Sequence, residues 1–104
     1  MARASANEDI YGDVNTLDDI RDINRQIRGE MKQVSKRDEL TELKKRSDYL
    51  CTLTYAPSWQ TKFGNKSGRF RQVAKEEDER STRAANSVAR RKGFDVEYHA
   101  WRGN

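Results

Sequence analysis

The chain has 104 residues, and its 21 Lys and Arg against 17 Asp and Glu give a formal net charge of +4 at pH 7. Hydrophobic residues make up 34% of it and charged residues 37%, compared with about 45–50% and about 25% in typical soluble domains. One small domain with a thin core is expected at this length. Such a domain folds marginally, forms a homo-oligomer, or completes its core on a partner.

Composition also excludes several kinds of chemistry. Cys51 and His99 are the only residues of their types, so the chain forms no internal disulfide and lacks the four ligands of a structural zinc site. Residues 64–68 pair Lys with Ser but lack the first glycine of a phosphate-binding loop, and the acids at 76–79 spread around a helix instead of converging on a cation. We therefore predict no enzyme activity, no metal and no cofactor. Without an apolar run of membrane-spanning length, we expect a soluble cytoplasmic protein that does not associate with membranes.

The first helix signal lies near Thr16. Residues 1–15 show no helical period, and we expect a flexible N-terminal arm there. Thr16 is followed three residues later by Asp19, a variant of the capping box that begins a helix. Apolar residues then recur every three or four positions from Leu17 to Val34, which predicts an amphipathic helix.

A second helix is predicted after a short turn. Ser35 to Asp38 forms another start signal, leucines recur from Leu40 to Leu53, and Pro57 disfavours helix at the residue before it. Residues 16–55 therefore predict an antiparallel αα-hairpin. Two alternatives stay open: a single rod that dimerises as a coiled coil, and a strand over residues 49–55, which are rich in aromatic and β-branched types.

The second half of the chain is predicted as a loop, a helix and a tail. Residues 57–70 contain two Gly-punctuated turns and predict a basic loop or a β-hairpin. Helix formers dominate residues 71–92, ending at Gly93, and residues 94–101 alternate like a strand. We predict one helix-dominated α+β domain over residues 16–104, with an all-α three-helix domain as the alternative.

Charge is distributed unevenly along the chain. Residues 1–22 carry six acids against two bases, whereas residues 57–104 carry eleven bases against six acids. A basic segment attracts polyanions, and aromatic rings among the bases can stack on unpaired nucleobases. The competing interpretation assigns these rings to the core. The candidate nucleic-acid-binding residues are Lys62, Lys66, Arg69, Arg71, Arg90, Arg91, Lys92, Trp59, Phe63 and Phe70.

We predict a small non-catalytic regulatory or accessory protein that contacts DNA or RNA with little sequence preference, or an acidic protein surface. A helix-turn-helix over residues 83–102 is disfavoured, because its second helix would alternate like a strand. The alternative is a protein–protein interaction module, such as a regulator, an inhibitor or an assembly adaptor, that acts through the apolar stripe of the hairpin.

Overall fold

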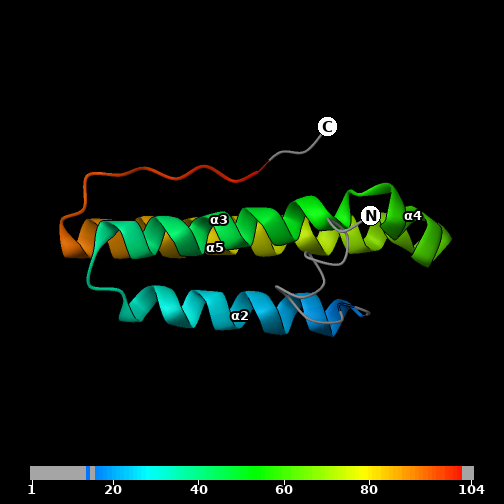
Figure 1. The fold of residues 1–104 in the computed structure, drawn as a ribbon, viewed down its shortest axis with the longest axis horizontal. Coiled ribbons are helices and arrows are strands. Elements are labelled where there is room, and N and C mark those ends of the chain that lie inside the picture. Colours follow the sequence, from blue (N-terminus) through cyan, green and yellow to red (C-terminus); the bar gives the residue numbers. More distant parts are fainter. Residues whose placement is uncertain (1–13, 15, 102–104) are drawn as a thin grey trace.

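The described part of the chain is a bundle of three long helices with a short helix at one end (Figure 1). A computed structural model describes residue 14 and residues 16–101. The long helices are α2 (Leu17–Gln33), α3 (Arg37–Thr54) and α5 (Ser67–Lys92). The short helix α4 (Pro57–Phe63) and a 3₁₀ turn, η1 (Gly64–Lys66), connect α3 to α5. Because each connection reverses the chain, α2 and α5 run in the same direction and α3 runs opposite to both.

Helix α2 begins at the predicted capping box. The Asp19 backbone N–H donates to Thr16 Oγ1 at 3.2 Å, and the Thr16 N–H donates back to Asp19 Oδ2 at 2.9 Å. Two of the backbone N–H groups left without partners at this end are thereby satisfied. The predicted apolar stripe is confirmed, because Ile20, Ile27 and Met31 are fully buried.

Helix α3 extends through the segment for which a strand was the alternative. The β-branched residues fit the helix because their hydroxyls bond to carbonyl oxygens of the preceding turn: Thr52 Oγ1 donates to Asp48 O at 2.9 Å, and Thr54 Oγ1 donates to Cys51 O at 2.7 Å. The chain also bends at Val34, whose backbone is extended, so α2 and α3 do not fuse into a rod. The helical hairpin is therefore the observed arrangement.

The predicted loop or β-hairpin over residues 57–70 is wrong. Pro57 occupies the first turn of α4, where its missing N–H costs nothing and its fixed φ suits a helix. Gly64 ends α4 with a φ of +55°, a conformation that glycine adopts readily. Helix α5 then begins at Ser67 instead of Arg71, because the segment's aromatic residues recur at helical spacing and pack on the bundle.

The C-terminal tail is extended but forms no strand, and no strand occurs anywhere in the described residues. Side chains alternate as predicted, with Phe94, Val96 and Tyr98 half-buried while Asp95 and Glu97 are exposed. The tail runs back along α3 and α5 (Figure 1), so its neighbours are helices and not another strand. The α+β prediction is corrected for this reason, and the all-α alternative fits the fold.

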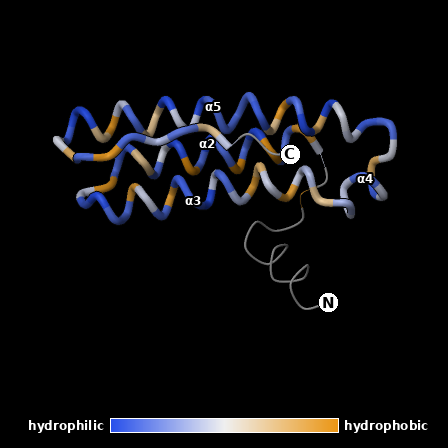
Figure 2. Tube along the Cα trace, turned by 90° about the horizontal axis from the view of Figure 1, so that it is seen from above, coloured by the Kyte–Doolittle hydropathy of each residue, from blue (hydrophilic) through white to orange (hydrophobic). Residues whose placement is uncertain are grey.

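The core lies along the bundle axis, where hydrophobic positions recur along each long helix (Figure 2). The predicted N-terminal arm falls outside the described residues, apart from Val14, which is buried in the core. Among the described residues, no helix combines the length and the apolar character that crossing a membrane requires. The largest buried apolar side chains are Ile20, Ile27, Met31, Leu40, Leu43, Leu50, Trp59 and Phe70.

Candidate functional site

The three aromatic residues of the predicted site form one ring cluster at the α4 end of the bundle. Phe63 and Phe70 stack with centroids 4.2 Å apart, and Trp59 lies 4.8 Å from Phe63 and 5.3 Å from Phe70. Trp59 and Phe70 are only 7% and 6% exposed, so they belong to the core. Phe63 is half-buried and is the ring in this cluster that a ligand can reach.

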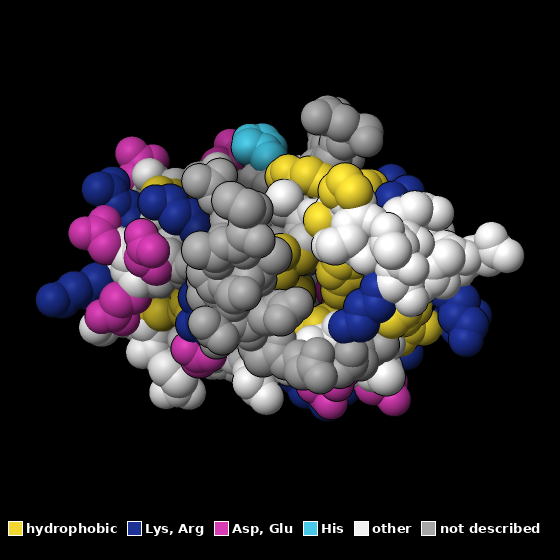
Figure 3. Space-filling model, turned by 45° about the vertical axis from the view of Figure 1, so that its right-hand side comes forward, with side chains coloured by type: hydrophobic (Ala, Val, Ile, Leu, Met, Phe, Trp, Pro, Cys, Tyr) yellow, Lys and Arg dark blue, Asp and Glu magenta, His cyan; other side chains and the backbone are white. Residues whose placement is uncertain are grey.

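A surface groove of about 570 Å³ opens beside this cluster, between the first turns of α2 and α5. Four predicted site residues line it, and α2 adds Arg21. Figure 3, in which the α4 end of the bundle is turned forward, shows hydrophobic side chains exposed on the surface with Lys and Arg side chains near them. The groove therefore joins an apolar floor to a basic rim. Its lining residues are Thr16, Leu17, Asp18, Arg21, Phe63, Lys66, Arg69 and Phe70.

Two other predicted residues mainly hold α4 in place. Lys62 lies over the Phe63 ring, with Nζ 5.4 Å from its centroid, and donates to the carbonyl oxygen of Val14 at 3.4 Å. Arg71 donates to Gln60 Oε1 at 3.3 Å and lies 5.4 Å from the Tyr55 ring centroid. Neither side chain lines the groove, so these cation–ring contacts and hydrogen bonds connect α4 to its neighbours.

The second predicted cluster lies at the other end of the molecule. Arg90, Arg91 and Lys92 form the last turn of α5, where cations stabilise the negative end of the helix dipole. Lys92 also donates through Nζ to the Val34 carbonyl oxygen at the end of α2. Arg69 and Arg90 are separated by 21 residues of one helix, which corresponds to about 32 Å. The structure therefore does not join the two basic clusters into one site.

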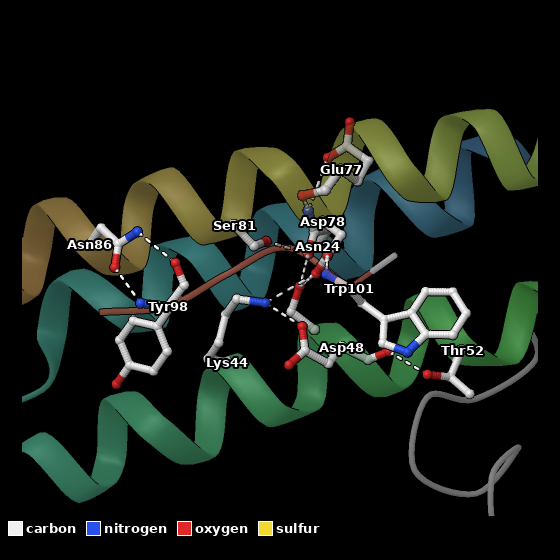
Figure 4. Close-up of polar contacts among 11 residues, drawn as sticks. Asn24, Lys44, Asp48, Thr52, Glu77, Asp78, Ser81, Asn86, Tyr98 and Trp101 are labelled. Carbon is white, nitrogen blue, oxygen red and sulfur yellow. Dashed lines mark hydrogen bonds and ion pairs between the residues drawn. The ribbon is translucent and has the colours of Figure 1, made fainter. Parts of the chain in front are cut away.

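A layer of buried polar side chains crosses the middle of the bundle (Figure 4). Asn24 of α2 donates to the Glu77 carbonyl oxygen at 2.6 Å and accepts from Ser81 Oγ at 2.6 Å. Ser47 of α3 donates to Asn24 Oδ1 and to Asp78 Oδ1, both at 3.3 Å. Each long helix thus contributes to one hydrogen-bonded layer, which fixes how the three helices align.

Ion pairs continue this layer on both sides. Lys44, only 3% exposed, contacts Asp48 and lies 3.2 Å from Asp78 Oδ1. Burial raises the pKa of Asp48, although Lys44 opposes the increase. On the α2 side, burial alone would raise the pKa of Glu77, but hydrogen bonds from Arg28 and Asn24 outweigh it and lower the pKa.

This polar layer has a structural role. Its donors and acceptors are satisfied by each other, as buried polar groups require, and the backbone N–H of Trp101 closes it by donating to Asp78 Oδ2 at 2.5 Å. Within the part of the chain that the structure describes, no group of His, Cys, Asp or Glu is placed to hold a metal ion. The layer was not predicted from the sequence, although Asn24 lies at a position within the apolar stripe of α2 and was the available signal.

No protein-family model, curated protein or solved structure matches the chain. Polar groups of different helices converge in the groove, in the polar layer, and in a second surface groove between α2 and α3 where three acids accompany Arg46. Of these places, the first groove combines three cations with an accessible aromatic ring. The groove is accordingly the candidate binding site.

Proposed function

We propose that the chain is a small non-catalytic, nucleic-acid-associated regulatory or accessory protein that binds a single strand at the groove between α2 and α5. One observation carries the proposal: Arg21, Lys66 and Arg69 border a groove whose floor includes the half-buried ring of Phe63. Cations beside an accessible ring are the combination that single-strand binding uses.

The two parts of the groove supply different interactions. Guanidinium and ammonium groups neutralise phosphates, which gives affinity without sequence preference and makes binding sensitive to salt. A base stacked on an aromatic ring contributes about 1–3 kcal/mol, and only an unpaired base can reach Phe63. A single strand is therefore the expected ligand.

The acid within the groove does not prevent phosphate binding. Asp18 Oδ1 lies 3.9 Å from Arg21 Nη1, and both side chains are substantially exposed. Exposed pairs of this kind contribute about 0–1 kcal/mol, so a phosphate can take the place of the Asp18 carboxylate at low energetic cost.

The alternative, a protein-interaction module, is less well supported in its predicted form. It requires the apolar stripe of the hairpin as its docking surface, but Ile20, Ile27 and Met31 are fully buried beneath the other helices. A protein partner would need another surface. An acidic peptide that competes at the groove would be one outcome of the binding test.

The experiment measures the affinity of labelled single-stranded DNA and RNA between about 50 and about 200 mM salt. The variant Lys66→Ala/Arg69→Ala should bind more weakly and reduce the slope of log K against log salt by about 1.4, or about 0.7 per lost phosphate contact. Lys36→Ala/Arg37→Ala removes two exposed bases at the start of α3, at the end of the bundle away from the groove, and is the matched control. It should bind like the parent chain.

Replacing the ring separates stacking from charge. Phe63→Leu keeps an apolar side chain in the groove and should weaken binding while leaving the salt slope unchanged, because stacking releases no counterions. Failure of the parent chain to bind any single strand at about 50 mM salt would exclude the proposal. Tighter binding to an acidic peptide than to a nucleic acid of equal charge would favour a protein partner.

A further inference from the structure

One edge of α2 is a continuous basic stripe. Arg21, Arg25, Arg28 and Lys32 recur at spacings of four, three and four residues, which places them on one side of a helix. Arg28 shows which side this is, because its Nη1 donates to Oε1 of Glu77 on α5 at 2.8 Å. The stripe therefore borders the seam between α2 and α5.

The neighbouring edge of α5 is also basic. Arg80 Nη1 donates to Glu77 Oε2 at 2.6 Å, so guanidinium groups from two helices meet over one carboxylate that is 3% exposed. Arg69 and Arg91 each lie eleven residues from Arg80, which is close to three helical turns and keeps them on the same edge. Both are exposed, so this row follows the α2 stripe along the seam.

We use the name basic face for both rows together with Arg83, which lies three residues beyond Arg80 on the exposed side of α5. Helices α2 and α5 together carry twelve bases and eight acids, and two of these acids, Glu77 and Asp78, are buried. Residues 36–55 and 94–101, on the other side of the bundle, carry six acids and five bases. The bundle is therefore polarised, with its excess positive charge along α2 and α5. The basic face comprises Arg21, Arg25, Arg28, Lys32, Arg69, Arg80, Arg83 and Arg91.

We infer that the strand bound at the groove continues along the basic face, and that this face is a second phosphate-binding surface. The inference rests on the proposed function. Arg21 and Arg69 line the groove and also begin the two rows, so the surfaces are continuous. From Arg69 to Arg91 the face spans about 33 Å, and it bridges the two basic clusters that the fold keeps apart.

The charges on this face are available to a ligand. Arg25 Nη1 lies 3.3 Å from Asp22 Oδ1, but both side chains are more than half exposed, and such pairs exchange readily for phosphate. Arg28 and Arg80 are held in position by Glu77, yet each guanidinium has five N–H donors and keeps some for a phosphate. A regular row of cations matches the regular charge of a nucleic-acid backbone.

Strand length provides the test. Single strands of about 4 and about 16 nucleotides are titrated against the full chain and against Arg25→Ala/Arg83→Ala, which removes two exposed bases from the basic face. For the long strand we expect an affinity loss of about tenfold at about 50 mM salt and a salt slope smaller by about 1.4. The short strand, which occupies the groove alone, should bind the variant and the parent chain equally.

The control variant is Arg37→Ala/Lys45→Ala on α3, which also removes two exposed bases, one of them from an exposed ion pair at spacing three. If Arg25→Ala/Arg83→Ala unfolds at a lower temperature than the parent chain, its weaker binding could reflect lost structure. The same titration is then made with Lys32→Ala/Arg91→Ala, which removes two bases at other positions of the basic face. An unchanged affinity of the long strand for both variants would overturn the inference while leaving the groove proposal intact. An equal loss in the α3 control would also overturn it. If the parent chain binds neither single strand, the proposed function itself is contradicted.

Discussion

The side-chain amide of Asn86 pairs with the backbone of Tyr98 in both directions. Its Nδ2 donates to the Tyr98 carbonyl oxygen at 3.0 Å, and its Oδ1 accepts from the Tyr98 N–H at 2.8 Å. A neighbouring β-strand would offer the same donor and acceptor, so one amide on α5 takes the place of a strand. The Tyr98 hydroxyl lies 3.0 Å from Thr41 Oγ1 on α3. Tyr98 is thus attached to two helices at once.

Asn86→Ala should release the tail from the bundle. Two part-buried hydrogen bonds are lost and the Tyr98 backbone groups lose their partners, so we expect unfolding to become easier by about 1–3 kcal/mol. Amide hydrogen exchange at Tyr98 should accelerate more than exchange in the middle of α3. Ser87→Ala, at the exposed neighbouring position, is the control and should change neither quantity.

The tail also shows the limit of a period-2 pattern. Alternation correctly predicted which side chains of residues 94–100 face inward, because any extended segment lying on a surface exposes alternate residues. Trp101 departs from the pattern, because it follows the half-buried Ala100 and packs on Tyr55 with ring centroids 4.8 Å apart. The alternation did not reveal what the segment lies against. The partner, Asn86, is twelve residues upstream of Tyr98 on a helix, and nothing in its local sequence distinguishes it from an exposed helical amide.

Lys44→Met should destabilise the bundle strongly. The substitution keeps the length of the side chain but leaves Asp78, which is 2% exposed, without its cation. Breaking a buried pair from one side costs about 3–5 kcal/mol, measurable by denaturant unfolding monitored by circular dichroism. Lys45→Met changes the adjacent, exposed residue and should shift stability by no more than about 0.5 kcal/mol. Equal stabilities of the two variants would contradict the structural role assigned to the polar layer.

Glu77 should contribute to the acid sensitivity of the fold. Its pKa in the folded chain is lowered from an ordinary value of 4.5, so the unfolded chain binds more protons as the pH falls below that value, and stability decreases. Glu77→Gln should cost about 1.5–3 kcal/mol at pH 7, and the difference from the parent chain should shrink as the pH falls through the folded pKa. Asp48 acts in the opposite direction, because its pKa is raised.

The measurement is denaturant unfolding of both chains at a series of pH values. Glu79→Gln, at the exposed position two residues further along α5, is the matched control and should follow the parent chain throughout. A stability difference between Glu77→Gln and the parent chain that stays constant with pH would show that the charge of Glu77 is not what the interaction requires.

Individual parts of the candidate site were visible in the sequence, but their assembly was not. The segment from Phe63 to Phe70 supplied both rings and cations, and its charge predicted an interaction surface there. Arg21 lies among acids in a stretch of negative net charge, so composition pointed away from it. Only the packing of the first turn of α2 against the first turn of α5 makes Arg21 part of the groove. The helical spacing of the α2 stripe could be seen in the sequence. Which helix packs beside the stripe could not, and that helix decides whether the stripe is part of a larger basic surface.

Cys51 should report on global unfolding. Its side chain is 2% exposed, and burial, reinforced by the nearby carboxylates of Asp78 and Asp48, raises the pKa of the thiol to about 12. Because the thiolate is the reactive form, the folded chain should hardly react with a thiol reagent at neutral pH, and labelling should proceed through opening of the bundle. Labelling rates in increasing denaturant, followed by mass spectrometry, should therefore rise in parallel with the unfolded population. Rapid labelling of the folded parent chain, at the rate of the fully denatured one, would contradict the burial of this thiol.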